Sequence, residues 1–361
     1  MSGCSIFSGP DASSAGRIDW RSPLDSIDSG WQGEPAAVDG RAFFYALRQL
    51  RAVSMRDGGL LWKQPPLSDI PGEAARITVV NDLVIATFTN GIHAFAQSNG
   101  VERWWTQKER DYSSHHPETD GTYLYATSQS RRLDKIDLAN GGLVWSTALV
   151  SSATGLPAIG VSVVKRRDTL FVSGFREIPG TGFRKAWIAA YDALTGAVLW
   201  DSEPLPNRTG AIGRHVVVGD VLIFSDYEGG SIAAVSTRAG ALVWRMVTDP
   251  YYVGPPTGPV VDGDVVYVGA GDKNVYALRP ATGAVIWRRQ LGGSVNQIAI
   301  CGNHVLATST GTQFLLSKRT GAVIRDQTSD IGEDDFFVSG FAVADGMVAV
   351  SGKNAIYGFR C

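Results

Sequence analysis

Short apolar segments separated by polar turn residues recur along the whole chain. Residues 259–271, PVVDGDVVYVGAG, hold two apolar runs around an Asp-Gly turn, and residues 275–287, VYALRPATGAVIW, hold two more around a Thr-Gly turn. Asp-Gly is the strongest short hairpin signal, and Val, Ile and Tyr favour pleated, half-buried positions. This unit is therefore predicted to form four short strands, named A to D in chain order.

The four-strand unit repeats along the chain with a period in the low forties. A second clear copy of strands C and D is residues 188–200, IAAYDALTGAVLW, and a degenerate last copy ends at Arg325, where a tryptophan is expected. The other copies end at tryptophans spaced 42, 41, 55, 44 and 43 residues apart, which are Trp62, Trp104, Trp145, Trp200, Trp244 and Trp287. This period, with no helix-length amphipathic stretch inside it, is typical of propeller blades.

The two ends of the chain each hold part of one further unit. Residues 336–361 supply strands A, B and C, whereas residues 15–20, AGRIDW, reproduce the end of the repeat, with Gly16 at the turn glycine and Trp20 at the closing tryptophan. Pairing the two parts leaves no sheet edge open between the first and last blades. We therefore predict an all-β fold, an eight-bladed β-propeller of four-stranded antiparallel blades, closed by an N-terminal strand that completes the last blade beside residues 355–360.

The repeated glycine and tryptophan have predicted structural roles. The turn glycine adopts a positive φ that a residue with a Cβ disfavours. The tryptophan offers a large apolar surface for sealing one blade against the next, and the small alanine of strand C leaves room for it. We therefore interpret seven of the ten tryptophans as blade-packing residues and not as ligand contacts: Trp20, Trp62, Trp104, Trp145, Trp200, Trp244 and Trp287.

Composition and charge narrow the classes of function. The 361 residues are 44% hydrophobic and 19% charged, and the net charge is −2. A nucleic-acid-binding protein usually presents a basic face, so nucleic acid is not an expected partner. The longest apolar runs have the length of strands, so no membrane-spanning segment is expected. We expect residues 14–361 to form a single, monomeric propeller domain after a flexible leader of residues 1–13.

The pattern Ala-x-Arg-x-x-Thr-Gly-x-x-x-Trp from Ala277 to Trp287 resembles the pyrroloquinoline-quinone (PQQ) repeat, and copies of it extend over nearly the whole chain. The resemblance implies a propeller but leaves the function open, because families with this repeat include quinoprotein dehydrogenases and non-catalytic scaffolds. In length, and in having one eight-bladed domain, the chain resembles the BamB-type lipoproteins of the outer-membrane protein assembly machinery. That resemblance implies a non-enzymatic protein-binding scaffold of the bacterial cell envelope, with an envelope assembly component as its partner.

The first residues, MSGCSIF, resemble the end of a bacterial lipobox, in which Cys4 would be acylated. The resemblance implies a protein in the periplasm that is anchored to the outer membrane through Cys4 and has no other membrane contact. Residues 1–13 would then be the tether. The basic and apolar regions of a signal peptide do not precede Cys4 in this sequence. The alternative interpretation is an unmodified cysteine near a disordered terminus.

The other two cysteines are expected at the same propeller face. Cys301 falls at the turn between strands A and B of the seventh unit, and Cys361 falls at the end of strand C of the eighth. If Cys4 carries lipid, a disulfide between Cys301 and Cys361 is one expectation in an oxidising compartment. The alternative is two free thiols that pack as small hydrophobic side chains.

The sequence contains no recognisable catalytic motif. By resemblance, PQQ dehydrogenases carry a vicinal cysteine pair, a calcium site of acidic and amide residues and a catalytic aspartate, and no residues here match these features. The G-x-S-x-G, P-loop and H-E-x-x-H patterns do not occur either. We therefore expect no enzymatic activity, no cofactor and no metal site. The alternatives are a PQQ-dependent quinoprotein-like oxidoreductase and a carbohydrate- or peptide-binding propeller.

Binding residues are expected on the loops at one propeller face. The D–A and B–C loops share that face, and the 55-residue spacing places an insertion, residues 175–187, in the B–C loop of the fourth blade. Aromatic and Arg side chains are enriched at protein interfaces, and we predict that a protein segment docks there by aromatic contacts or by β-augmentation. The predicted binding face comprises Trp31, Tyr112, His115, His116, Arg176, Phe183, Arg184, Arg208, Arg214, Tyr251, Tyr252 and Phe336.

Some residues near these loops have competing interpretations. Trp187 and Phe337 begin strands, and packing in the core is the alternative for them. The pair His115 and His116 suggests a metal site, but adjacent residues in a strand point to opposite sides, which hinders chelation. We expect this pair to be exposed to solvent instead.

Overall fold

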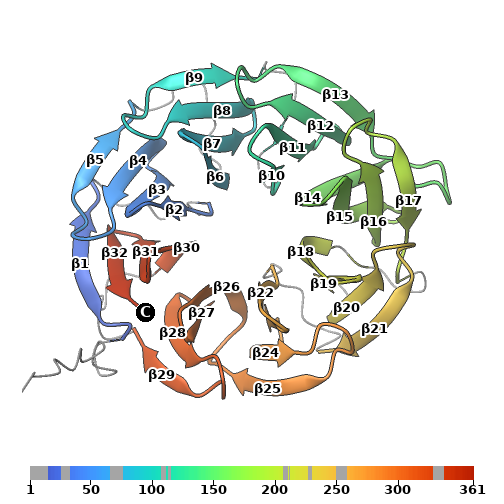
Figure 1. Cartoon of the computed structure of the whole chain (residues 1–361). Helices are drawn as coiled ribbons and strands as arrows, with labels where there is room; N and C mark the ends of the chain where they lie inside the picture. The colour runs from blue at the N-terminus through green and yellow to red at the C-terminus, as the bar shows by residue number, and fades with distance from the viewer. Residues whose placement is uncertain are drawn as a thin grey trace, which may run out of the picture.

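The chain folds into a ring of eight four-stranded sheets around a central channel (Figure 1). The computed structural model describes residues 15–25, 33–65, 76–106, 111–112, 115–205, 210, 212–226, 230–248, 258–327 and 337–361. Thirty-two strands confirm the predicted eight-bladed all-β fold, and the described residues contain no helix. Accordingly, no helix in that part of the chain is long and apolar enough to cross a membrane.

The first four blades are antiparallel meanders, with strand A beside the channel and strand D at the outer edge (Figure 1). Blade 1 comprises β2 (Ala36–Val38), β3 (Arg41–Ala46), β4 (Gln49–Ser54) and β5 (Leu60–Lys63). Blade 2 comprises β6 (Arg76–Val80), β7 (Leu83–Phe88), β8 (Gly91–Ala96) and β9 (Glu102–Trp105). Blade 3 comprises β10 (Glu118–Thr119), β11 (Tyr123–Ser128), β12 (Arg132–Asp137) and β13 (Leu143–Ala148). Blade 4 comprises β14 (Ala158–Arg166), β15 (Thr169–Glu177), β16 (Arg184–Asp192) and β17 (Val198–Ser202).

The last four blades repeat this arrangement, and the chain's first strand belongs to the last of them. Blade 5 comprises β18 (Ile212–Val218), β19 (Val221–Asp226), β20 (Ser231–Ser236) and β21 (Leu242–Val247). Blade 6 comprises β22 (Val260–Asp262), β23 (Val265–Gly269), β24 (Asn274–Leu278) and β25 (Val285–Gln290). Blade 7 comprises β26 (Val295–Cys301), β27 (His304–Ser309), β28 (Thr312–Ser317) and β29 (Val323–Asp326). Blade 8 comprises β30 (Phe337–Ala344), β31 (Met347–Gly352), β32 (Ala355–Arg360) and, as strand D, β1 (Ile18–Pro23).

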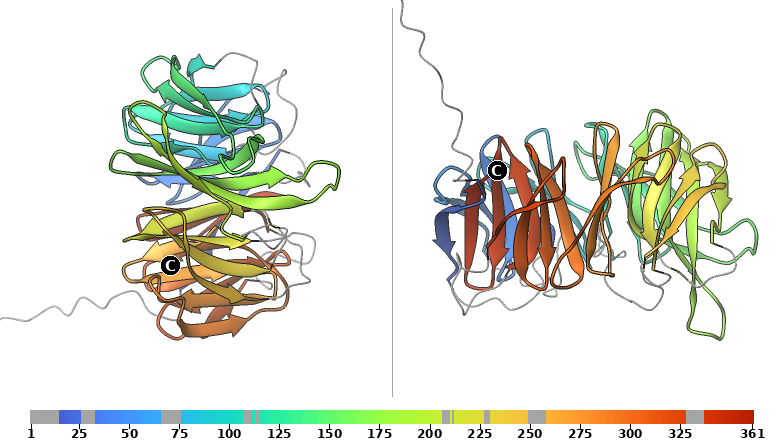
Figure 2. Two further views of the ribbon diagram at one scale, coloured as in Figure 1. Left: turned by 90° about the vertical axis from the view of Figure 1, so that its right-hand side faces the viewer. Right: turned by 90° about the horizontal axis from the view of Figure 1, so that it is seen from below.

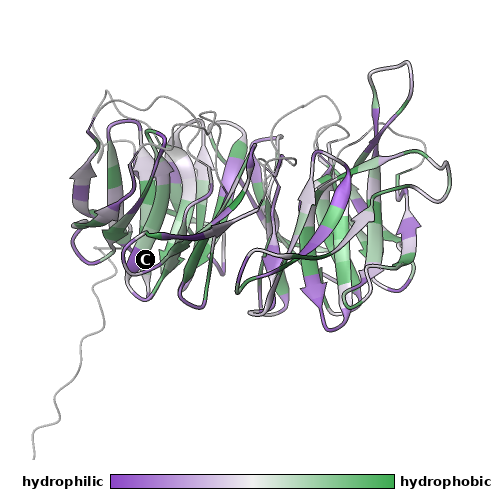
Figure 3. Cartoon of the chain, turned by 90° about the horizontal axis from the view of Figure 1, so that it is seen from above, coloured by the Kyte–Doolittle hydropathy of each residue, from purple (hydrophilic) through white to green (hydrophobic). Residues whose placement is uncertain are grey.

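The hydrophobic core is divided into clusters between neighbouring blades, which stack around the disc seen in Figure 2. Between blades 1 and 2, for example, the rings of Tyr45 and Phe88 meet edge to face, with 5.0 Å between their centroids. Strands B and C are buried on both faces and therefore consist of nearly continuous apolar runs. Figure 3 shows green, hydrophobic segments inside the blades and purple, hydrophilic residues at many of the turns.

Each blade-packing tryptophan lies against the C–D turn of the next blade. Six of their indole nitrogens donate a hydrogen bond to a backbone carbonyl oxygen there over 2.7–3.1 Å, as Trp104 does to Leu138. Trp145 takes the same place without such a bond to any described residue. A Cβ at Gly141 would lie 2.5 Å from the Trp104 ring, so the turn has room for glycine alone. The predicted packing role is confirmed for all seven tryptophans.

A β-bulge in strand D precedes each of these tryptophans. In all eight sheets the pairing of strands C and D shifts register at this point. In blade 1, Ala52 pairs with Trp62 and Val53 pairs with Leu60, which makes Leu61 the extra residue. A bulge bends the strand and re-aims the following side chain, and at an outer edge it also opposes pairing with a foreign strand.

The N-terminal strand closes the ring as predicted, because β1 pairs antiparallel with β32. Gly16 and Arg360 meet where blade 8 needs its C–D turn, and they reproduce the hydrogen bond of a continuous turn. The Gly16 amide donates to the Arg360 carbonyl over 2.8 Å, as the Gly58 amide donates to the Ser54 carbonyl over 2.9 Å in blade 1. Trp20 then contacts blade 1 as the other tryptophans contact their neighbours.

The joint between blades 7 and 8 is built differently from the other seven. Arg325 stands at the tryptophan position, and its aliphatic stem packs beside Gly16. The side-chain nitrogen of Gln327 donates a hydrogen bond to the Gly16 carbonyl. A disulfide joins Cys301, at the end of β26, to Cys361, after β32, with 5.6 Å between the two Cα atoms. A covalent link therefore spans the joint at which arginine replaces tryptophan.

Deleting residues 1–22 should unseat blade 8. The deletion leaves the outer edge of β32 unpaired and removes Trp20, and loss of a buried tryptophan side chain alone costs about 3–5 kcal/mol. We expect a lower Tm and a broader, less cooperative melting transition by circular dichroism. Deletion of residues 1–14 is the matched control, because it leaves β1 and Trp20 in place. A 1–22 deletion with unchanged cooperative melting would contradict the closure.

Candidate functional site

The residues predicted to form one binding face are distributed over several environments. Six predicted functional residues lie outside the part of the chain that the structure describes: Cys4, Trp31, Arg208, Tyr251, Tyr252 and Phe336. The other predicted residues fall into three groups, which are buried between strands, exposed on a hairpin of blade 4, or placed at the central channel.

The expectation that Tyr112 and His115 are exposed is wrong. Tyr112 is 3% exposed and its hydroxyl donates a 2.7 Å hydrogen bond to the buried Asp134 carboxylate. His115 is 2% exposed and shares a 2.9 Å hydrogen bond with the Thr127 hydroxyl. Burial lowers the pKa of His115 to about 4. Both side chains therefore anchor the segment that enters blade 3 and do not offer a docking surface.

Arg176 is also buried, contrary to the prediction. Its Nε donates a 2.7 Å hydrogen bond to Glu203, and its Nη1 donates to the Glu177 carbonyl. Because the guanidinium is held from two sides, it braces the end of β15 in the blade 4 hairpin. Trp187 and Phe337 are buried as well, which confirms the core interpretation for these two residues.

The insertion in blade 4 forms a hairpin of two nine-residue strands, β15 and β16, which Figure 2 shows projecting beyond the disc in green. The Ile178 amide donates to the Phe183 carbonyl over 2.8 Å and closes the turn at its tip. Phe183 is 58% exposed, and the Arg184 guanidinium lies over the Phe175 ring, 4.5 Å from its centroid. The hairpin thus carries an exposed aromatic side chain at the end of two hydrogen-bonded strands.

Four charged or titratable side chains from four blades meet at the channel. Glu34, just before β2, contacts the Arg76 guanidinium of β6. Its other carboxylate oxygen lies 3.4 Å from Nδ1 of His116, which precedes β10, and 3.7 Å from Nη1 of Arg214 in β18. The two predicted residues His116 and Arg214 are therefore brought together by a carboxylate that was not predicted.

Electrostatics keep this carboxylate ionised. Burial raises the pKa of Glu34, but Arg76, His116 and Arg214 outweigh burial and lower it to about 2. Burial and Arg76 in turn lower the pKa of His116 well below its usual value, against the attraction of Glu34. His116 is thus half-buried and neutral at pH 7, and the expected solvent-exposed histidine pair is wrong for both of its members.

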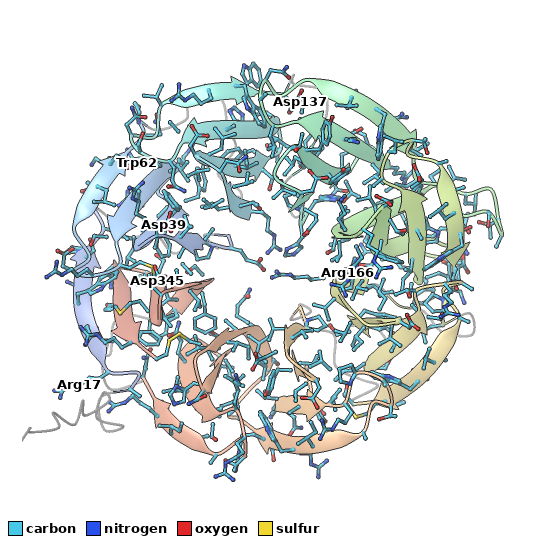
Figure 4. All side chains as sticks on the ribbon, in the orientation of Figure 1. Arg17, Asp39, Trp62, Asp137, Arg166 and Asp345 are labelled. Atoms are coloured by element: carbon cyan, nitrogen blue, oxygen red, sulfur yellow. A yellow bond between two sulfur atoms is a disulfide. The ribbon has the colours of Figure 1, made fainter. Side chains whose placement is uncertain are left out.

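The channel residues enclose two adjoining cavities of about 330 Å³ and 410 Å³, which share Glu34, Ile77, Arg214 and Val261. Arg166 also lines the first cavity, and Figure 4 shows its side chain extending into the central opening. Glu118 lies in the same cavity, where burial raises its pKa to about 7 although Arg214 and Lys165 act in the opposite direction.

These residues share a sequence signal that spacing alone does not reveal. Glu34 and His116 each directly precede a proline at the start of a strand A, and Arg214 lies near the start of β18. Charged side chains at or near the starts of these innermost strands meet at one channel. Among the described residues, no group of three His, Cys, Asp or Glu side chains is placed to hold a metal ion.

Comparison with known proteins gives one family and two kinds of relative. The family model described as outer membrane protein assembly factor BamB matches residues 11–181 and 184–330. Outer membrane protein assembly factor BamB of Yersinia pestis is 22% identical over 262 residues, which cover 66% of this chain and 62% of that protein. The dehydrogenase subunit of the quinone alcohol dehydrogenase of Komagataeibacter europaeus is 24% identical over 294 residues, which cover 76% of this chain and 34% of that protein.

The solved structure of BamB from Moraxella catarrhalis has the same fold, with a TM-score of 0.65 and 15% identity over 94% of this chain and 98% of that chain. The match to the alcohol dehydrogenase subunit spans about a third of that relative's length, and the match to the Yersinia protein spans about three fifths. Function therefore has to be argued from the residues of this chain.

Replacing Glu34→Gln should change how stability depends on pH. The pKa of Glu34 is lowered from 4.5 to about 2 on folding, which contributes about 3 kcal/mol to the free energy of unfolding above pH 4.5. That contribution disappears as the pH falls through the folded-state pKa.

Urea unfolding at pH 7 and at about pH 2 measures this effect. We expect Glu34→Gln to be less stable than the wild type at pH 7 and the difference to vanish near pH 2. Asp220→Asn, at an exposed ion pair with Arg238, is the control and should change stability by less than about 1 kcal/mol. A wild-type-to-variant difference that is independent of pH would contradict the assignment.

Proposed function

Because the chain belongs to the family of outer membrane protein assembly factor BamB, we propose that it is a non-enzymatic protein-binding scaffold of the bacterial cell envelope. Its partner would be a protein component of outer-membrane protein assembly, as the name of the family indicates. A propeller supports this role by holding loops and hairpins at fixed positions on one face, where partner proteins can dock.

The observation that carries the proposal is the blade 4 hairpin. Phe183 leaves 58% of its surface exposed at the tip, and a large exposed aromatic side chain is a typical anchor at a protein interface. The strands below the tip pair over their full length, with Glu177 opposite Arg184 at the end. Little conformational freedom would be lost when such an anchor docks, which favours binding.

The end of β15, next to the hairpin turn, is fixed to two parts of the ring. Arg176 binds Glu203 within blade 4, and Glu177 forms a 3.1 Å ion pair with Arg131 of blade 3. Arg184 follows Phe183 in sequence, and its guanidinium lies over the Phe175 ring, so it adds a positive charge to the hairpin. An apolar segment with a nearby acidic group is the partner chemistry that this combination suits.

Membership of the same family also supports a proposal for the protein's location. The proposed site of action is the periplasmic side of the outer membrane, with the protein held there by acylated Cys4, and the propeller would act as a monomer. Radiolabelled palmitate should enter the protein in its native host and should be absent from Cys4→Ser. Labelling of the wild type that persists in Cys4→Ser would reject the anchor.

The quinone-dependent alcohol dehydrogenase relative supplies the second candidate, a PQQ-dependent oxidoreductase. The residues of this chain do not fit a PQQ site. Cys301 and Cys361 bond each other across blades 7 and 8, so they do not form the expected vicinal pair. The described acidic residues also lack a cluster placed for a metal ion. The carboxylate at the centre of the channel is already engaged by arginine, so these residues define no catalytic step.

Site-specific photo-crosslinking in the native host tests the scaffold function. Phe183→p-benzoylphenylalanine should form an adduct with an outer-membrane assembly protein. The same probe at Arg238, which is exposed at a C–D turn on the opposite face, should not form it. Phe183→Ala should weaken partner binding about tenfold, as loss of an aromatic anchor does. Equal adducts at both positions would contradict the proposal, and so would dye reduction with ethanol after loading with PQQ and calcium.

A further inference from the structure

Positively charged side chains outnumber negatively charged ones in the channel cavity. The guanidinium groups of Arg76, Arg166 and Arg214 line it together with the carboxyl groups of Glu34 and Glu118. Arg76 contacts Glu34 directly, so the charges of these two residues largely cancel. Glu118 is the other carboxyl group in this lining, and burial raises its pKa to about 7, so it offsets the charges of Arg166 and Arg214 only in part. The cavity therefore carries a net positive charge.

The donors of these two arginines are incompletely used. Nη1 of Arg214 lies 3.7 Å from Glu34, which is too long for a hydrogen bond, and the side chain is 48% exposed. The side chain of Arg166 forms no hydrogen bond or ion pair with any described residue. A guanidinium has five N–H donors in a planar fork, so most of these donors remain available to a ligand.

The backbone of a neighbouring blade helps to orient Arg214. A Cβ at Gly258, which precedes β22, would lie 2.8 Å from the Arg214 Cβ and would displace the arginine stem. The next residue, His215, is buried and shares a 2.6 Å hydrogen bond with Ser173. Since packing positions the arginine before any ligand arrives, binding would cost little additional side-chain entropy.

We propose that the channel cavity binds a small oxyanion, a carboxylate or a phosphate, between Arg166 and Arg214. Guanidinium groups match the two oxygens of such anions with paired, charge-assisted hydrogen bonds. The volume of about 330 Å³ suits a small molecule. The site is independent of the proposed partner-binding hairpin, so the absence of anion binding would leave the scaffold assignment unchanged.

Glu118 gives the site a distinguishing pH dependence. Against the effect of burial, Arg214 and Lys165 lower the pKa of Glu118 by favouring its ionised form, whereas Asp120 raises it. An anion near Arg214 repels the ionised carboxylate. Since the pKa of Glu118 is about 7, anion affinity should fall as the pH rises through neutrality. A surface that attracts anions without Glu118 nearby would not show this dependence.

Isothermal titration calorimetry at constant ionic strength tests the site with two probes, sulfate and succinate, which both remain dianionic between about pH 6.5 and pH 8. We expect a dissociation constant below about 1 mM for at least one probe. Tighter binding of sulfate indicates a phosphate ligand, and tighter binding of succinate indicates a carboxylate. Arg166→Gln should weaken binding at least about fivefold, whereas Arg238→Gln, remote from the channel, should not change it.

Two further results decide the proposal. Affinity should fall about fivefold between pH 6.5 and pH 8 in the wild type and stay constant in Glu118→Gln. Arg166 is exposed, so its substitution should leave the Tm unchanged, and any loss of binding then reports on the site. No saturable binding of either probe, or equal affinity in Arg166→Gln and Arg238→Gln, would overturn the proposal.

Discussion

The contact between a tryptophan of one blade and the turn glycine of the next is the interaction on which the ring depends. It combines a large apolar ring, a glycine with positive φ and, in six of seven cases, an indole hydrogen bond to the backbone. Every blade except the seventh supplies one tryptophan to its neighbour, so the angle between blades repeats and the ring closes. The bulge before each tryptophan gives the side chain the direction that this contact needs.

The geometry of the ring also determines what the channel and the loop face can do. Repetition places the starts of the eight innermost strands around one axis, where residues far apart in sequence, such as Glu34 and Arg214, come within 3.7 Å. The same ring supports the blade 4 hairpin, which projects beyond the disc in Figure 2 and carries the exposed Phe183. The proposed partner-binding and anion-binding sites therefore use different parts of one scaffold, and neither requires the ring to change shape.

Repeated local signals in the sequence are sufficient to predict the architecture. Gly16 and Trp20 match the end of the repeat, and residues 336–361 supply only strands A, B and C, so together they predict that the N-terminal strand completes the last blade. The accessibility of single residues is not encoded in this way. Tyr112 is buried because its hydroxyl reaches Asp134 in the next blade, a contact that depends on how the connecting segment packs. Which side chains meet Glu34 across the channel depends on the ring's radius, so this cluster could not be derived from the spacing of residues in the sequence.

Comparison of Gly141→Ala with Gly121→Ala tests the central role of the tryptophan–glycine contact most directly. Both glycines have positive φ and lie in turns of blade 3, but a Cβ at Gly141 meets Trp104 whereas a Cβ at Gly121 meets nothing within 4 Å. Alanine therefore introduces backbone strain at both positions. The difference between the two losses of unfolding free energy then measures the contact with Trp104. We predict that Gly141→Ala loses at least about 2 kcal/mol more than Gly121→Ala in urea unfolding. Equal losses in the two variants would contradict the account.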